Sequence, residues 1–230
     1  MTARDGAAAA AHNGGPVLVL TKLRPPALHR STLARADLLT RLDRCADRRL
    51  IMVACPAGFG KTTLLASWAA ARSGREPVGW VTLDEGDNDP VVLWAHIIEA
   101  TRRLCPSVVD WVAADDVGSA ALTDAVLPRL VNALTDHPPV TLVLDDYRRL
   151  TGRASRDSVA WFLDHAPAGC QLVIATRSEP RLPLAVLRAR GELCEFRSDD
   201  LRFTVDEAAH APPRAPTTPG ARSRLLRSDP

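Results

Sequence analysis

Five short apolar runs, separated by segments of helical periodicity, dominate the pattern of this chain. The runs are rich in Val, Leu and Ile and are followed by turn-forming or polar residues, which is typical of strands buried in a parallel sheet. They cover residues 50–54, 78–83, 140–144, 171–176 and 192–197. Because strands and helices alternate along the chain, the pattern predicts an α/β domain.

Between the runs, apolar residues recur at helical spacing. The pair Asp89 and Pro90 is a typical helix start, a cap followed by a proline, and the apolar spacing continues from it to Leu104. Thr204 and Glu207 match a capping box, which predicts one more helix. Other helices are expected at residues 33–47, from the glycine-rich loop through 71, and at 122–134, 158–165 and 184–190.

Composition limits the size of the fold and the class of partner. The chain has 230 residues, enough for one α/β domain, and its net charge of 29 − 27 = +2 gives no global basic field for nucleic acid. The stretches 1–16 and 210–230 lack apolar periodicity, so we expect a disordered N-terminal arm and a disordered Pro/Arg-rich tail around a domain at 17–209. No apolar run reaches about 18 residues, and no membrane partner is expected.

The cysteines bear on the cellular compartment of the protein. The five cysteines are scattered, odd in number and without a C-x-x-C pair, which predicts reduced thiols in a cytoplasmic protein.

Acidic residues gather at 84–89, just after the second run. Their spacing fits no calcium-loop template, so a surface loop is favoured there over a metal site.

The segment between the first run and the next helix carries the strongest chemical signal. Glycines there leave main-chain N–H groups open to phosphate at a helix N-terminus, and Lys61 is one of only two lysines among 29 basic residues. A Lys at this position reaches β- and γ-phosphates, and the Thr62 hydroxyl can coordinate Mg²⁺. The strict motif has Gly where this chain has Cys55. We expect ATP and Mg²⁺ as cofactors, held by Pro56, Ala57, Gly58, Phe59, Gly60, Lys61, Thr62 and Thr63.

The third run ends in two carboxylates, Asp145 and Asp146. Ligands of open parallel sheets bind at this end of the strands. We expect Asp145 to hold hydrated Mg²⁺ together with Thr62, and Asp146 to orient or deprotonate a water. Arg177 follows the fourth run and could reach a γ-phosphate; from the residues alone, an ordinary surface salt bridge is equally favoured.

Six motifs in order resemble the N-terminal ATPase domain of the large LuxR-type, MalT-like transcriptional activators, a family of signal-transduction ATPases with numerous domains (STAND). The motifs are Thr21–Pro26, Cys55–Thr63, Leu83–Pro90, Leu142–Tyr147, Ile174–Pro180 and Asp200–Thr204. The resemblance implies a P-loop NTPase sheet of order 5-1-4-3-2, with helices on its faces. It also implies an ATP-dependent change from a closed monomer to a self-associating form.

The resemblance assigns roles to individual residues as well. Arg177 would sense the γ-phosphate, and Arg35 resembles an Arg that the family carries near the nucleotide ahead of the loop. Arg148 stands where family members often have His. The family continues beyond the capping box into a winged-helix region, helical repeats and a DNA-binding helix-turn-helix. This chain instead changes composition at about residue 211, which we interpret as truncation or a frame shift, so no direct DNA binding is expected.

The resulting hypothesis is an ATP-binding switch module with at most weak ATPase activity, ATP or ADP as its ligand, and self-association as a possible output. Two functional alternatives stay open. One is a P-loop kinase for a small molecule, although two acids at the site suit water better than an acceptor hydroxyl. The other is a remnant that binds nothing. A glycine-rich turn without a ligand is the simplest structural alternative.

Overall fold

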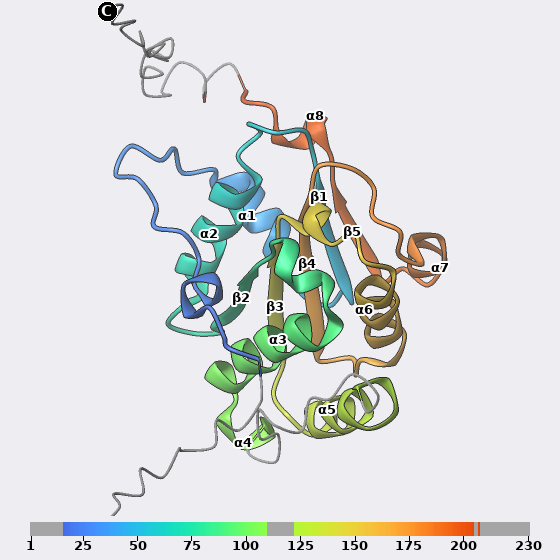
Figure 1. Ribbon diagram of the computed structural model, residues 1–230. Helices are drawn as coiled ribbons and strands as arrows, with labels where there is room; N and C mark the ends of the chain where they lie inside the picture. Colours follow the sequence, from blue (N-terminus) through green and yellow to red (C-terminus); the bar gives the residue numbers. More distant parts are fainter. Residues whose placement is uncertain (1–15, 110–121, 205–206, 208–230) are drawn as a thin grey trace, which may run out of the picture.

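Five parallel strands form a single sheet in the computed structural model, which describes residues 16–109, 122–204 and 207 (Figure 1). The order of strands is β2-β3-β4-β1-β5, which confirms the expected order 5-1-4-3-2 and the P-loop α/β class. The strands are β1 (Leu50–Ala54), β2 (Val78–Thr82), β3 (Val140–Asp145), β4 (Cys170–Thr176) and β5 (Leu193–Phe196). All four pairings are parallel, and Leu50 of β1 lies between Leu172 of β4 and Leu193 of β5.

Helices cover both faces of the sheet because successive strand residues point to opposite sides. Ile51 and Val53 pack in one hydrophobic cluster, and Leu50 and Met52 in the other. The face of the sheet that carries Ile51 and Val53 is covered by α1 (Ala36–Asp43) and α2 (Lys61–Arg72). The other face is covered by α3 (Pro90–Leu104), α5 (Leu127–Thr135), α6 (Arg153–His165) and α7 (Leu184–Ala189), with α3 and α6 in front of the sheet in Figure 1.

Several expected boundaries were wrong, and long-range contacts explain the clearest case. Helix α6 begins at Arg153, five residues before the expected start at 158. The Asn88 Oδ1 atom accepts hydrogen bonds from the backbone N–H groups of Thr151 (2.7 Å) and Gly152 (2.5 Å). The start of the helix is therefore stabilised by a residue from another loop, and no local cap signals it.

Short helical elements were also missed where loops were expected. Residues 106–109, where no helix was predicted, form α4 (Pro106–Val109). The predicted helix at 122–134 is split into a π-helical turn and α5, with Pro128 in the first turn of α5. The other short elements are η1 (Leu20–Leu23), η2 (Glu85–Asn88), η4 (Leu122–Val126), η5 (Tyr147–Arg149) and α8 (Ser198–Leu201). The segments expected to be disordered, 1–16 and 210–230, lie outside the described residues except for Pro16.

A buried ion pair ties the N-terminal segment to the loop after β2. Lys22 Nζ lies 2.5 Å from Asp87 Oδ2 and 3.1 Å from Asp84 Oδ1, and η1 packs beside the edge strand β2. Burial raises the pKa of Asp87, but hydrogen bonds from His96 and Lys22 outweigh it and hold this pKa below its usual value. The expectation of a surface loop is thus wrong for Asp87, which is fully buried.

His96 completes this network in a definite tautomer. The backbone N–H of Val19 donates to His96 Nε2 (3.2 Å), so the ring proton resides on Nδ1. Nδ1 donates to Val92 O (2.9 Å) and lies 3.1 Å from Asp87 Oδ1. His96 therefore packs directly against the buried carboxylate of Asp87.

Two of the five cysteines are joined in a disulfide, which corrects the expectation of reduced thiols. Cys45, just after α1, is bonded to Cys194 of β5, and their Cα atoms are 6.1 Å apart. The pair is separated by 149 residues in sequence, so spacing gave no sign of it. Cys55, Cys105 and Cys170 are free and buried, and burial raises the pKa of the Cys170 thiol to about 12.

Candidate functional site: a phosphate loop beside two aspartates

The glycine-rich loop between β1 and α2 depends on two glycines for its shape. Gly58 and Gly60 have φ angles of 83° and 75°, in the left-handed region that side chains disfavour. Cys55 is not among the left-handed residues, and its side chain is buried in the core beneath α1 and α2. The departure from the strict motif at this position therefore leaves the fold of the loop intact.

Lys61 begins α2 and turns its side chain back over the loop. Its ammonium donates to the carbonyls of Cys55 (2.7 Å) and Pro56 (2.9 Å). Burial lowers the pKa of Lys61, and the nearby Arg177 acts in the same direction, against the opposing effect of Asp145 and Asp146. A desolvated cation of this kind gains from a bound anion, as a phosphate would provide.

Thr62 and Asp145 meet directly at the end of β3. The Thr62 hydroxyl is 3.0 Å from both carboxylate oxygens of Asp145, which is only 4% exposed. Burial raises the pKa of Asp145, with the charge of Asp146 adding to it, although the hydrogen bond from Thr62 opposes the shift. A cation would offset this unfavourable burial of charge. The sequence-based pairing of these two residues is thus matched by their positions.

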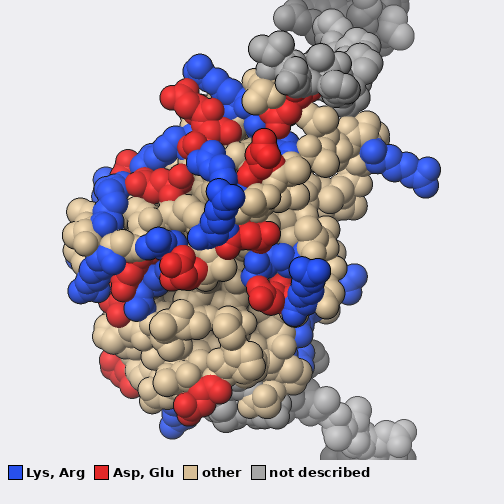
Figure 2. Space-filling view, turned by 180° about the vertical axis from the view of Figure 1, so that it is seen from behind, with Lys and Arg blue, Asp and Glu red and all other residues tan. Residues whose placement is uncertain are grey.

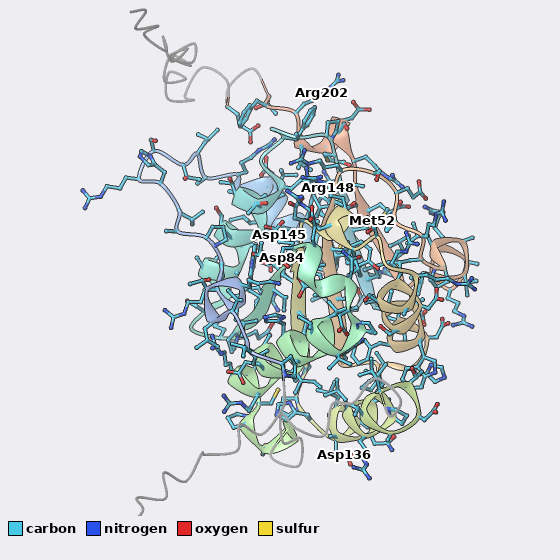
Figure 3. All side chains as sticks on the ribbon, viewed as in Figure 1. Met52, Asp84, Asp136, Asp145, Arg148 and Arg202 are labelled. Atoms are coloured by element: carbon cyan, nitrogen blue, oxygen red, sulfur yellow. A yellow bond between two sulfur atoms is a disulfide. The ribbon has the colours of Figure 1, made fainter. Side chains whose placement is uncertain are left out.

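Asp146 adopts the left-handed backbone conformation, with φ 57° and ψ 38°. It is the non-glycine residue with positive φ in the described part of the chain. Its carboxylate lies 3.1 Å from Arg148 Nε and 3.5 Å from Arg149 Nε. Figure 3 shows Asp145 and Arg148 toward the same end of the sheet and Asp136 toward the other.

Most of the predicted phosphate and metal residues share a cavity of about 230 Å³. Thr82, at the end of β2, also lines it, and the sequence gave no reason to select this residue. The remaining lining residues are Ala57, Gly58, Gly60, Lys61, Thr62, Thr63, Asp145, Asp146 and Arg177. Pro56 is not among them and contributes only its carbonyl, as the acceptor for Lys61.

A second cavity of about 510 Å³ continues from the first, because Gly58, Gly60 and Thr63 line both. It is the more apolar of the two, and it contains the predicted residues Phe59 and Arg35. Sequence reasoning missed several of its lining residues; these are Ser31, Thr32, Leu33, Leu39, Leu64, Ser67 and Phe203. A small polar cavity joined to a larger apolar one has a form suited to a ligand with a charged group and an apolar group.

Arg35 connects this second cavity to the C-terminal end of the described chain. Its guanidinium donates to the carbonyls of Leu201 (2.6 Å) and Arg202 (2.7 Å) and forms two bonds with the carboxylate of Glu207 (3.0 and 3.1 Å). It also lies 5.0 Å from the ring centre of Phe203. Glu207 in turn accepts from the Thr204 N–H, and Thr204 Oγ1 accepts from the Glu207 N–H, as a capping box requires.

Charges of both signs are mixed on the surface of the described chain. In Figure 2, basic and acidic side chains are interspersed over the upper part of the described surface, and the lower part carries few of either. This mixture agrees with the small net charge of +2. No helix in the described ranges combines the length and the apolar character needed to cross a membrane.

Comparison with known proteins identifies the lineage of the chain. No family model matches it. The HTH-type transcriptional regulator MalT of Serratia proteamaculans (strain 568) is 37% identical over 194 residues, which is 84% of this chain and 21% of that protein. This chain is a MalT homologue. It spans about a fifth of the length of that MalT, so the homology concerns one part of a much longer regulator.

Solved structures overlap this MalT homologue only loosely. A chain of the Drosophila origin recognition complex bound to DNA has a TM-score of 0.47 at 10% identity, covering 75% of this chain and 94% of the other. A STAND protein with a tetratricopeptide repeat sensor from Pyrococcus horikoshii has the same TM-score and identity, covering 81% and 26%. These overlaps are too distant to bear on function.

Proposed function

We propose that this chain is the ATP-binding switch module of a MalT-like transcriptional regulator, acting in the cytoplasm and hydrolysing ATP slowly. The observation that carries the proposal is the meeting of Lys61, Thr62 and Asp145 at one cavity, with Thr62 Oγ1 3.0 Å from both Asp145 oxygens. A desolvated ammonium and a desolvated carboxylate side by side suit a polyphosphate with its metal ion.

The donor set also fits Mg²⁺. This ion takes hard oxygen ligands, usually one or two carboxylates with phosphate and water, and Asp145 with the Thr62 hydroxyl supplies that combination. When bound, Mg²⁺ would neutralise charge on the phosphates. The helix start at Lys61 directs the first backbone N–H groups of α2 toward the same cavity. The larger cavity, which holds Phe59, Arg35 and Phe203, would take the nucleoside.

Hydrolysis would depend on two residues beside the phosphates. Asp146 would accept a proton from the attacking water, and Arg177 would neutralise charge on the γ-phosphate. Arg35 lines the nucleoside cavity and is hydrogen bonded to Leu201 and Glu207, so a bound nucleotide would shift the C-terminal end of the described residues. The module would then act by changing its conformation, and self-association would be one result of that change. DNA would be bound only by other parts of the regulator.

A titration of ATP and of ADP, each with Mg²⁺, tests this proposal on the wild-type chain and the Lys61→Ala variant. We expect saturable binding by wild type with a dissociation constant in the micromolar range and a loss of affinity in the variant. Single-turnover measurements should then show slow hydrolysis. Absence of binding by folded wild type would refute the proposal, and rapid turnover without any other partner would argue against a switch.

A further inference from the structure

The carboxylate of Asp146 is engaged on both oxygens by arginines of the same turn. Arg148 Nε lies 3.1 Å from Oδ1, and Arg149 Nε lies 3.5 Å from Oδ2. Asp146 also lines the phosphate cavity, so the arginines hold the carboxylate at the point where water would be activated. We propose that Arg148 is a positioning residue that restrains Asp146 and thereby keeps ATP turnover slow. This inference rests on the proposed function.

The two arginines differ in how firmly they are held. Arg149 is anchored to the loop after β2: its Nη1 is 3.3 Å from Glu85 Oε1, and its carbonyl accepts from Asn88 Nδ2 at 3.1 Å. Within the described part of the chain, the Arg148 side chain forms its hydrogen bond and its ion pair with Asp146. Arg148 is therefore the restraint that can be removed without disturbing a neighbouring element.

The turn itself does not depend on the Arg148 side chain. Asp146 is held in its left-handed conformation by main-chain bonds, including Arg149 N–H to Asp146 O at 2.9 Å and Leu150 N–H to Tyr147 O at 3.0 Å. Tyr147 is buried and fixes the turn to the core. Removing the Arg148 side chain should therefore leave the position of the Asp146 backbone unchanged while freeing one of its oxygens.

The chemistry explains why this restraint slows the reaction. In hydrolysis, a water oxygen forms a bond to the γ-phosphorus, the bond from that phosphorus to the bridging oxygen breaks, and ADP leaves with the electron pair. The water proton passes to a carboxylate oxygen of Asp146 and then to solvent. The guanidinium of Arg148 occupies one acceptor site of Oδ1 and holds the carboxylate in one orientation. Arg148 thereby limits how well Asp146 can turn toward the attacking water.

The test compares the full chain with Arg148→Ala, measuring kcat at saturating ATP and the dissociation constant for ATP separately. General bases contribute about 10²- to 10⁴-fold to rates, so partial release of Asp146 should raise kcat by at least about fivefold, with ATP affinity within about twofold of wild type. Arg148→Lys keeps a single cationic contact, so its kcat should lie between those of wild type and Arg148→Ala. Arg153→Ala serves as the matched control, because Arg153 is 90% exposed and pairs only with Asp157 in the described chain.

A second pair of variants separates positioning from general disruption. Asp146→Asn should abolish turnover, and adding Arg148→Ala to it should restore none, because the gain acts through the Asp146 carboxylate. A kcat for Arg148→Ala equal to or below wild type, with ATP still bound, would overturn the inference while leaving nucleotide binding in place. A gain that persists in the double variant would overturn it too. Failure of wild type to bind ATP would instead remove the proposed function, and this inference with it.

Discussion

Lys61→Ala is the most direct perturbation of the phosphate loop, and the structure sets the size of its effect. The ammonium donates to the Cys55 and Pro56 carbonyls, at 2.7 and 2.9 Å. It must leave both to reach a phosphate. Loss of one member of a buried charge pair costs about 2–5 kcal/mol. Subtracting the two bonds given up places the expected loss near the lower end, at about 2–3 kcal/mol, or a roughly 30- to 150-fold weaker affinity.

Calorimetric titration with ATP and Mg²⁺ measures this loss, and thermal unfolding checks the fold. The variant loses two hydrogen bonds but also a cation whose pKa burial has lowered, and these effects oppose each other. We therefore expect the stability of the nucleotide-free chain to change by no more than about 1 kcal/mol. Lys61→Met, which keeps the apolar stem, should match Lys61→Ala in affinity. An affinity within about threefold of wild type in a folded variant would refute the assignment of this loop to phosphate.

Three further predictions concern the fold around the site. Asp145→Asn should raise the thermal stability of the chain at neutral pH and remove the Mg²⁺ dependence of ATP binding. Burial raises the pKa of Asp145 in the folded state, so the folded state favours the protonated carboxyl. The protonated Asp145 therefore supports the fold at low pH, and this support is lost as the pH rises through the pKa of the folded state. The stability gain should shrink as the pH is lowered toward 4, and a gain independent of pH would contradict the reasoning. Gly60→Ala should destabilise by about 1–2 kcal/mol through backbone conformation alone, because a Cβ there meets nothing within 4 Å; urea unfolding that matches wild type would disprove this. Reductant should lower the free energy of unfolding by about 3–5 kcal/mol, because the Cys45–Cys194 disulfide joins residues 149 positions apart and so restricts the unfolded chain. As a control, the unfolding of Cys45→Ser should not change when reductant is added.

The sheet and the phosphate loop were predictable because their signals are local. A strand buried on both faces must be an apolar run, and β1 and β3 read as such directly. The link between Thr62 and Asp145, 83 residues apart, followed from a general rule that ligands of parallel sheets bind at the carboxyl ends of the strands. The order of the strands was implied by the resemblance to the family.

Features that depend on distant partners could not be predicted in this way. Lys22 and Asp87, Cys45 and Cys194, and the contact of Asn88 with the start of α6 each join segments whose sequences carry no sign of the other. The acidic stretch 84–89 illustrates the limit: its charge suggested exposure, and only the folded positions of Lys22 and His96 explain a carboxylate that is fully buried. Roles for Arg35 and Phe203 likewise depend on helix α1 meeting the segment after α8.

The ion pair between Lys22 and Asp87 has a consequence for solubility. β2 is an outer strand of the sheet, and such a strand offers unpaired main-chain groups that can recruit another molecule. The turn carrying Lys22 lies against this strand and is fastened there by the buried aspartate. A chain that cannot form this pair would leave the outer edge of β2 without its fastened cover, open to pairing with a second molecule.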